Sequence, residues 1–446
     1  MTQLTGRARF AHLFRRAGFG ASEAELQAAM AAHTDEDTAY SLVVDRLVNY
    51  ESIPEFIDRI VPTSSNNDLV IQWWLERMLR TTRPLAEKMT LFWHDHFATS
   101  LEKDGMDIPK LQAQNALFRA SALGGFDQLL RDVSRNPAMI IWLDLNSNRR
   151  TSPNENWARE LLELFALGIG APASPNYSET DIREVTRAFT GYTVDTLGNF
   201  LLNISQHDSG TKTVLGQTCE SGDEVIAILM QYQKAGQFVA ARFICAKLFS
   251  FFAYPVDPDA AVVTPLAATL MASNFSIRAV MNQILRSAEF QSTQAYRAII
   301  KSPVEVAISA LRSLGAERVP LNGVLSRLRD QGQRLFWPPD VGGWPSGHAW
   351  INASTVLSRC NMGASMINSL GNPSPDHAGG QTAASLLTGL TTSTEKVDRV
   401  LALLVDGYVT PTMRTQLNTY ASSANTDEKI RGLFNLVLAQ PEFQLN

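Results

Sequence analysis

Several short motifs of this chain place imidazole and carboxylate side chains next to one another. His94, Asp95 and His96 lie in the segment FWHDHF, and His207 and Asp208 lie in the segment QHDSG. Imidazole and carboxylate groups are the ligands that suit Zn, Fe or Mn, and a helical bundle can bring them together from several helices. The set therefore predicts a site for a divalent metal ion.

The two histidines of FWHDHF cannot both serve that ion from a regular helix. At about 100° per residue, His96 lies on a different side of the helix from His94. Either the helix ends near Trp93, so that the segment is irregular, or only His94 lies at the site. In the second case, His96 is a hydrogen-bonded core residue.

The segment NENWARELLELF carries a stripe of carboxylates along a predicted helix. Glu160 and Glu163 lie three residues apart, on the side opposite to the apolar residues. Such a stripe is commonly the solvated face of an amphipathic helix. Leu164 flanks Glu160 closely, however, so we expect the Glu160 carboxylate to need a partner such as Arg159, Arg187 or a metal ion.

Other candidate residues lie in segments that are predicted to be loops. In QHDSGTKTVLG, His207 and Asp208 are favoured because side chains on scaffolded loops are often functional, and Lys212 is an anion partner or a solvated charge. In WPPDVGGW, Asp340 and Trp344 are part of a Pro-stiffened loop. Its aromatic faces could stack on a sugar or a peptide, or the loop could be a rigid plug over a helical core.

The overall composition narrows the function classes. A net charge of −5 argues against a general nucleic-acid-binding surface, and three widely separated cysteines argue against a disulfide framework or a Cys-rich zinc site. No apolar run reaches the roughly 18 residues that a membrane span requires. No secretory or twin-arginine signal follows the N-terminal arginines, so we expect no membrane span and a cytoplasmic location.

Helical periodicity dominates the chain and must position these side chains. The predicted helices cover residues 26–47, 69–79, 85–97, 111–123, 157–167, 181–189, 223–252, 260–271, 277–290 and 304–314. One β-hairpin is predicted over residues 192–204, where Leu197, Gly198 and Asn199 supply the turn.

We therefore expect an all-α protein: a large multi-helix body with one small β-hairpin and long loops. Residues 1–370 would form the main helical domain. Residues 371–394, rich in Gly, Ser, Thr and Pro, would form a linker, and residues 395–446 a small C-terminal helical segment that packs on the main body.

Taken together, the motifs resemble a bacterial family known as domain of unknown function 1800. They are HLFRRAGFGAS, FWHDHF, NENWARELLELFALG, DIREVTRAFTGY, HDSGTKTVLG and LFWPPDVGGWPSGHAWIN, and they cover nearly the whole chain in order. Members of that family are commonly exported and often encoded beside a sulfatase-like protein. The resemblance thus implies an envelope or extracellular pathway and a sulfatase-like partner, although this chain has no evident export signal.

The resemblance marks motif positions but gives them no roles. These positions are His94, Asp95, His96, Asn154, Glu155, Asn156, Arg159, Glu160, Glu163, Glu184, Arg187, His207, Asp208, Lys212, Asp340 and Trp344.

From the side chains, we predict a metal-dependent enzyme, hydrolytic or oxidative, with a divalent metal ion as cofactor. The expected roles are catalysis by Glu160, Glu163 and Asp208, metal binding by His94, His96 and His207, and substrate binding by Arg159, Arg187, Lys212, Asp340 and Trp344. These groups would converge at about 2.0–2.2 Å from the ion. The alternative is a non-catalytic binding or envelope-assembly scaffold whose polar motifs are structural networks. A carbohydrate-binding surface on the tryptophan loop ranks third.

Overall fold

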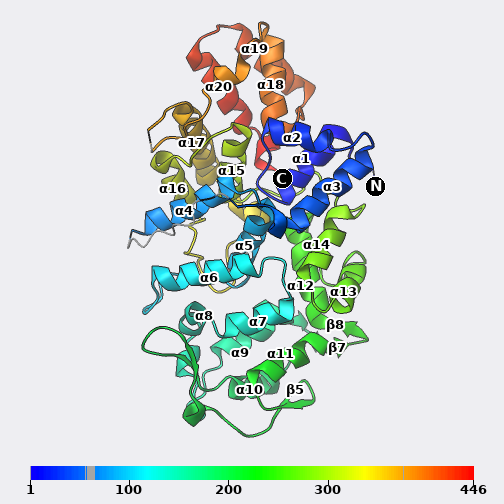
Figure 1. Cartoon of the computed structure of the whole chain (residues 1–446), viewed down its shortest axis with the longest axis vertical. Helices are drawn as coiled ribbons and strands as arrows, with labels where there is room; N and C mark the ends of the chain where they lie inside the picture. Colours follow the sequence, from blue (N-terminus) through cyan, green and yellow to red (C-terminus); the bar gives the residue numbers. More distant parts are fainter. Residues whose placement is uncertain (1, 56, 58–65, 375) are drawn as a thin grey trace.

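The protein is an elongated assembly of helices (Figure 1). The computed structural model describes residues 2–55, 57, 66–374 and 376–446. Within these residues, 21 α-helices account for most of the chain, and the only sheets are four antiparallel two-stranded ones. The expected fold class, a mostly helical body with small hairpins, is confirmed.

The helices in chain order are α1 (Gly6–Arg16), α2 (Glu23–Met30), α3 (Glu36–Val48), α4 (Asn67–Arg80), α5 (Pro84–His96), α6 (Ile108–Ala120), α7 (Phe126–Ser134), α8 (Pro137–Trp142), α9 (Asn156–Glu160), α10 (Glu179–Ala188), α11 (Gly222–Gln231), α12 (Val239–Phe252), α13 (Val263–Ala272), α14 (Ile277–Arg286), α15 (Pro303–Ser313), α16 (Leu321–Asp330), α17 (Ala353–Ser369), α18 (Ser393–Val405), α19 (Pro411–Ser422), α20 (Asp427–Leu438) and α21 (Pro441–Gln444). A π-helix, η3 (Leu161–Ala166), continues α9, and short 3-10 turns include η1 (Tyr50–Ser52).

The predicted hairpin is present as β3 (Tyr192–Val194) paired with β4 (Phe200–Leu202). Three further hairpins were not predicted: β1 (Gly170–Ala171) with β2 (Ser174–Pro175), β5 (Lys212–Val214) with β6 (Gln217–Cys219), and β7 (Gln233–Lys234) with β8 (Gln237–Phe238). Strands of two or three residues are too short to show the alternation of polar and apolar residues that marks a strand.

Two hydrophobic cores hold the helices together. One is built mainly from α1 to α3, α5 and α7 to α14, and the other from α4 and α15 to α21. Segment 371–394 contributes Ala378 and Leu387 to the second core, and the Ala378 carbonyl accepts a hydrogen bond from the Glu317 amide at 2.9 Å. This segment is therefore packed against the helical body, and α18 to α21 share a core with α15.

Helix α5 lies between the two cores and carries buried charges on both sides. Lys88 forms an ion pair with Glu305 of α15, and Glu87 binds Arg77 of α4 and Arg119 of α6. Arg77 and Arg119 hold the pKa of the Glu87 carboxyl below its usual value even though burial alone would raise it. These contacts fix the end of α5, which carries the FWHDHF motif.

None of the helices in the described ranges is both long enough and apolar enough to cross a bilayer.

Candidate functional site

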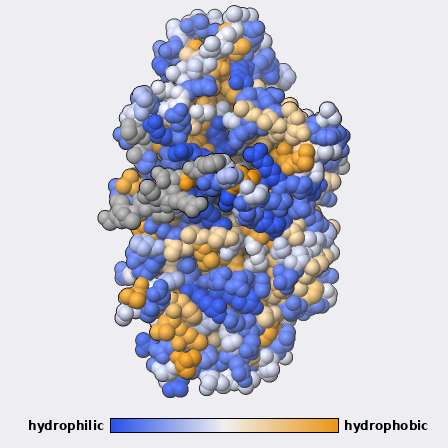
Figure 2. All heavy atoms as spheres, viewed as in Figure 1, coloured by the Kyte–Doolittle hydropathy of each residue, from blue (hydrophilic) through white to orange (hydrophobic). Residues whose placement is uncertain are grey.

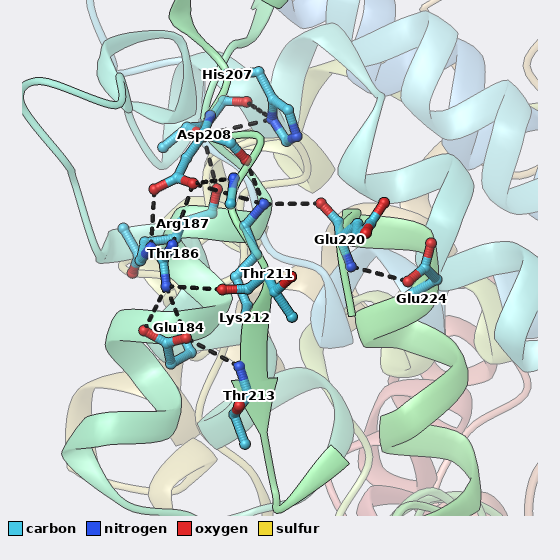
Figure 3. Close-up of polar contacts among 12 residues, drawn as sticks. Glu184, Thr186, Arg187, His207, Asp208, Thr211, Lys212, Thr213, Glu220 and Glu224 are labelled. Atoms are coloured by element: carbon cyan, nitrogen blue, oxygen red, sulfur yellow. Dashed lines mark hydrogen bonds and ion pairs between the residues drawn. The ribbon is translucent and has the colours of Figure 1, made fainter. Parts of the chain in front are cut away.

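The HDSG segment lies against α10 in a dense polar cluster (Figure 3). Arg187 of α10 donates to Asp208 through Nε, at 2.9 Å from Oδ2, and through Nη2, at 3.2 Å from Oδ1. Its Nη1 donates to Glu184 at 2.9 Å, and Glu184 in turn accepts a hydrogen bond from the Thr213 amide. Hydrogen bonding to Arg187 lowers the pKa of Asp208, so this carboxylate is neutralised by a partner rather than poised to take up a proton.

The other polar residues of the HDSG segment are also engaged. His207 Nδ1 lies 2.8 Å from the carbonyl oxygen of Thr190, and the Lys212 ammonium is fully buried, where it donates to the carbonyls of Asp208 and Glu220. These contacts hold β5 and β6 against α10 (Figure 3). The geometry gives His207, Asp208, Lys212 and Arg187 a role in holding the hairpin.

The two histidines of FWHDHF face different parts of the protein. His94 Nε2 accepts a hydrogen bond from the Phe336 amide at 3.2 Å, and its ring packs against Trp74 and Trp344. Burial lowers the pKa of His94 to about 3. His96 is also buried, and its Nε2 lies 3.1 Å from the Phe165 carbonyl. His96 is thus a hydrogen-bonded core residue, the second of the two alternatives for this motif.

The predicted convergence of these groups on one metal ion is not found. Throughout the described part of the chain, no group of three or more His, Cys, Asp or Glu side chains is arranged to hold a metal ion. The physical reason is local: His94 and His96 face different sides of α5, and His207 is bound to Thr190 beside α10.

Glu160 and Glu163 do lie close together, and Asp340 joins them. Burial, Glu163 and Asp340 all raise the pKa of Glu160. Tyr177 donates to Glu163 Oε2 at 3.3 Å, and burial together with that carboxylate raises the pKa of Tyr177 to about 12. Arg159 pairs with Glu155 and Glu179, and its charge also lowers the pKa of Glu160, although no ion pair joins Arg159 to Glu160 within the described residues. We refer to Glu160, Glu163 and Asp340 as the acidic rim.

Asp95, the middle residue of FWHDHF, lies beneath the WPPDVGGW loop. Its Oδ1 accepts a hydrogen bond from the Trp344 amide at 2.8 Å. The loop approaches so closely that a Cβ on Gly343, which has a φ of +85°, would lie 2.4 Å from Asp95 Oδ1. Glycine is required at position 343 because a side chain would collide with Asp95 and because a positive φ strains other residues. Burial raises the pKa of Asp95 to about 6, partly offset by the positive charge of Lys247.

Lys247 of α12 completes this arrangement. Its Nζ lies 3.2 Å from His96 Nδ1 and 3.2 Å from the carbonyl oxygen of Leu164, which belongs to the π-helix η3. Because His96 Nε2 faces a carbonyl and must carry the ring proton, Nδ1 is the acceptor for the lysine. Burial lowers the pKa of Lys247 to about 8, although Asp95 opposes that change.

Two features of Lys247 favour a catalytic role over a purely structural one. The Lys247 ammonium has three N–H groups, of which two are taken by His96 and Leu164, so the third remains for another acceptor. A π-helix inside an α-helix is frequent at functional sites because the wider turn redirects backbone carbonyls. Here the π-helix supplies the carbonyl that holds Lys247. We refer to Asp95 and Lys247 as the Asp–Lys pair.

Sequence reasoning missed this pair. Asp95 was noted as part of the His/Asp/Glu set and as a motif position but was given no role of its own, and Lys247 was not noted at all. The available signal for Lys247 was the helix VAARFICAKLFSFF, in which a lysine stands among apolar residues on both sides. A lysine that is buried in such a helix needs acceptors, and these come from segments about 80 and 150 residues away in the sequence.

Comparison with known proteins identifies a family for this chain but no activity. The model of a family described as "Protein of unknown function (DUF1800)" matches residues 12–445 of this chain. No curated protein matches the chain, and no solved structure does.

Proposed function

We propose that this chain, which belongs to the DUF1800 family, is a hydrolytic enzyme with the Asp–Lys pair as its acid–base site. The family description names no reaction, so the proposal is argued from the side chains. The observation that carries this proposal is the buried amine of Lys247, held by His96 and Leu164 where its charge acts on Asp95, although no ion pair joins the two groups in the described part of the chain. The pKa of Asp95 is raised to about 6 and that of Lys247 is lowered to about 8. Catalytic acids and bases work best with pKa values near the operating pH.

The protonation states of Asp95 and Lys247 determine which of them accepts a proton and which donates one in the proposed reaction. Between pH values of about 6 and about 8, Asp95 is a carboxylate and Lys247 is an ammonium. The Asp95 carboxylate then accepts a proton from an attacking water. Lys247 donates its third N–H to the substrate oxygen that becomes negative. Two fixed acceptors hold the amine in place, so that little reorganisation is needed as charge develops.

The acidic rim is the proposed substrate-facing surface. Three carboxylates, of which Glu160 feels one nearby cation, Arg159, favour a substrate that brings hydroxyl groups or positive charge. A divalent metal ion as cofactor remains a proposal, although no group of three or more such side chains in the described residues is arranged to hold one. Assays with a chelator and after addition of Zn²⁺ or Mn²⁺ test that cofactor separately from the Asp–Lys pair.

The test is a hydrolysis screen of the purified protein with chromogenic esters, phosphate esters, sulfate esters and glycosides. We expect turnover of at least one class, with a bell-shaped dependence on pH whose limbs lie near the pKa values of about 6 and about 8. Asp95→Asn should lower kcat by about 10²-fold or more. A rate that does not fall as the pH drops through about 6, or an Asp95→Asn variant as active as the wild type, would remove Asp95 from the mechanism, and a rate that does not fall above about 8 would remove Lys247.

Stability supplies an independent readout for the same variant. The pKa of Asp95 in the folded protein, about 6, lies above the ordinary value of 3.8. Its contribution to stability is therefore present below the ordinary pKa and is lost as the pH rises through about 6. Asp95→Asn keeps an acceptor for Trp344 but removes this charge, so at pH 7 we expect a gain of about 1–2 kcal/mol in urea unfolding. At pH below about 4 the gain should vanish.

A second candidate function is the non-catalytic scaffold, and one observation favours it: the HDSG cluster is fully engaged in ion pairs and hydrogen bonds. The sulfatase-like partner and a location in the cell envelope remain proposals that rest on the resemblance. If no substrate class is turned over and a sulfatase-like protein copurifies with the chain, the scaffold function takes the place of the enzyme.

A further inference from the structure

A cavity of about 720 Å³ lies between α2, α3, the end of α4 and the end of α15, away from the Asp–Lys pair. Pockets that bind small molecules usually have volumes of about 300–1,000 Å³ and mostly apolar walls with few polar groups. On the face drawn in Figure 2, apolar residues gather where Figure 1 places α2 and α3. The cavity is partly open to solvent, and its size matches one small molecule rather than a docked helix.

The cavity exists because much of the face that α2 turns toward it has small side chains. Ala24 and Ala28 of α2, and Ala32 just beyond its end, line the space together with Leu42 and Leu47 of α3. Residues four positions apart share one side of a helix, and alanine is too short to reach across to α3. Leu42 is 49% exposed, so the apolar wall continues to the opening.

Most of the charged residues that line the cavity are cationic. Arg46 and Arg80 line it and are exposed, and no hydrogen bond or ion pair joins either of them to another described residue at close range. Glu25, the acidic residue of the lining, is already bound by Arg312 at 2.8 Å and by the cap at Ser22. Three arginines and one glutamate line the cavity, so the net charge of its lining is positive.

Tyr50 adds a hydroxyl group to the lining. It lines the cavity four residues after Arg46, it is only 6% exposed, and its hydroxyl makes no hydrogen bond within the described part of the chain. The hydroxyl oxygen itself is reached by solvent, so it can donate to a molecule bound in the cavity. Arg46, Tyr50 and Arg80 all line the cavity, so N–H and O–H donors are available to an anionic group within it.

We propose that this cavity binds a free long-chain fatty acid, with the acyl chain along the alanine face of α2 and the carboxylate at Arg46, Tyr50 and Arg80. The apolar wall of the cavity would contact the acyl chain of the fatty acid, and the arginines at the opening would bind its carboxylate. The binding site is separate from the proposed acid–base site and does not depend on it.

The experiment is a calorimetric titration of the full chain with palmitate below its micelle concentration, with hexadecanol as the uncharged probe. We expect one palmitate per chain. Arg46→Glu should weaken palmitate binding by about tenfold or more and leave hexadecanol binding unchanged, because only the acid loses a charged donor. Ala28→Trp should fill the cavity and weaken both ligands by about tenfold or more.

Two matched variants serve as controls. Ala31→Trp places the same large ring on an exposed position next to α2 that does not line the cavity, and Arg431→Glu makes the same charge reversal on α20. Both should bind palmitate like the wild type, and thermal unfolding of all variants checks their fold.

Three results would overturn the proposal. They are absence of palmitate binding, unchanged binding by both Arg46→Glu and Ala28→Trp, and binding only to phosphatidylglycerol vesicles but not to monomeric palmitate. The last result would mean that the cationic opening contacts a membrane surface instead of enclosing a free acid.

Discussion

Lys247→Ala is expected to lower kcat for any hydrolysed substrate by about 10²–10⁴-fold, the range for loss of a positioned acid or base. The Lys247 ammonium is held by His96 and Leu164 and supplies the N–H that would reach the substrate. Removal of the side chain leaves both acceptors in place but takes away the proton donor. Steady-state kinetics at pH 7 on a substrate from the hydrolysis screen measures the loss.

Rescue by an added amine separates this role from a structural one. Ethylamine can enter the space left by Lys247→Ala and should restore part of the activity, because it is itself a proton donor. Lys110→Ala removes a surface lysine that pairs with Asp107, and it should leave kcat unchanged. A Lys247→Ala variant that keeps full activity, or one that loses it without unfolding and without rescue, would contradict the proposed role.

Glu305→Ala is expected to have the largest effect on stability, about 3–5 kcal/mol, because it leaves a buried charge unpaired. Its partner Lys88 is fully buried in α5, and Glu305 also accepts hydrogen bonds from Asn446 at 2.9 Å and from the Ser302 amide at 2.8 Å. Urea unfolding at pH 7 measures the change. The double variant Lys88→Met/Glu305→Leu should recover most of the loss, since no lone charge remains.

The same ion pair gives a dependence on pH. Burial alone would raise the pKa of Glu305, but Lys88 and Arg16 hold it at about 2. The folded pKa lies below the ordinary value of 4.5, so the stabilisation is present above that value and is lost as the pH falls through about 2. The difference between wild type and Glu305→Ala should therefore shrink in acid. Equal urea midpoints at pH 7 would show that the pair adds nothing.

The helical fold could be predicted from the sequence because apolar residues recur at helical spacing over long segments. The boundaries were less predictable. Residues 223–252 were expected to form one helix, but the chain leaves α11 at Gln231, turns at Ala235 and Gly236 with positive φ, and enters α12 at Val239. Apolar residues on both sides of this short hairpin continue the helical pattern, so periodicity alone could not locate the turn.

The candidate site was predictable only in part. Helix geometry correctly separated His94 from His96, because the angle between positions on one helix is fixed by local structure. The contacts of the other candidate residues depend on tertiary structure, which brings together segments that are far apart in the sequence. Sequence patterns alone could not predict these contacts. Arg187 and Asp208 were assigned to substrate binding and catalysis, yet they bind each other, whereas the charge of Asp95 acts on Lys247, which lies on a helix about 150 residues further along the chain.

The central claim is that the amine of Lys247 titrates near neutral pH beside Asp95. The most direct measurement is an NMR titration of the protein with ¹³C-methylated lysines, in which Lys247→Ala identifies the Lys247 signal. We predict a midpoint near the pKa of about 8, and a lower midpoint in Asp95→Asn because the carboxylate of Asp95 raises the pKa of Lys247. A midpoint at the ordinary lysine value of 10.5, unchanged in Asp95→Asn, would contradict the proposed acid–base site.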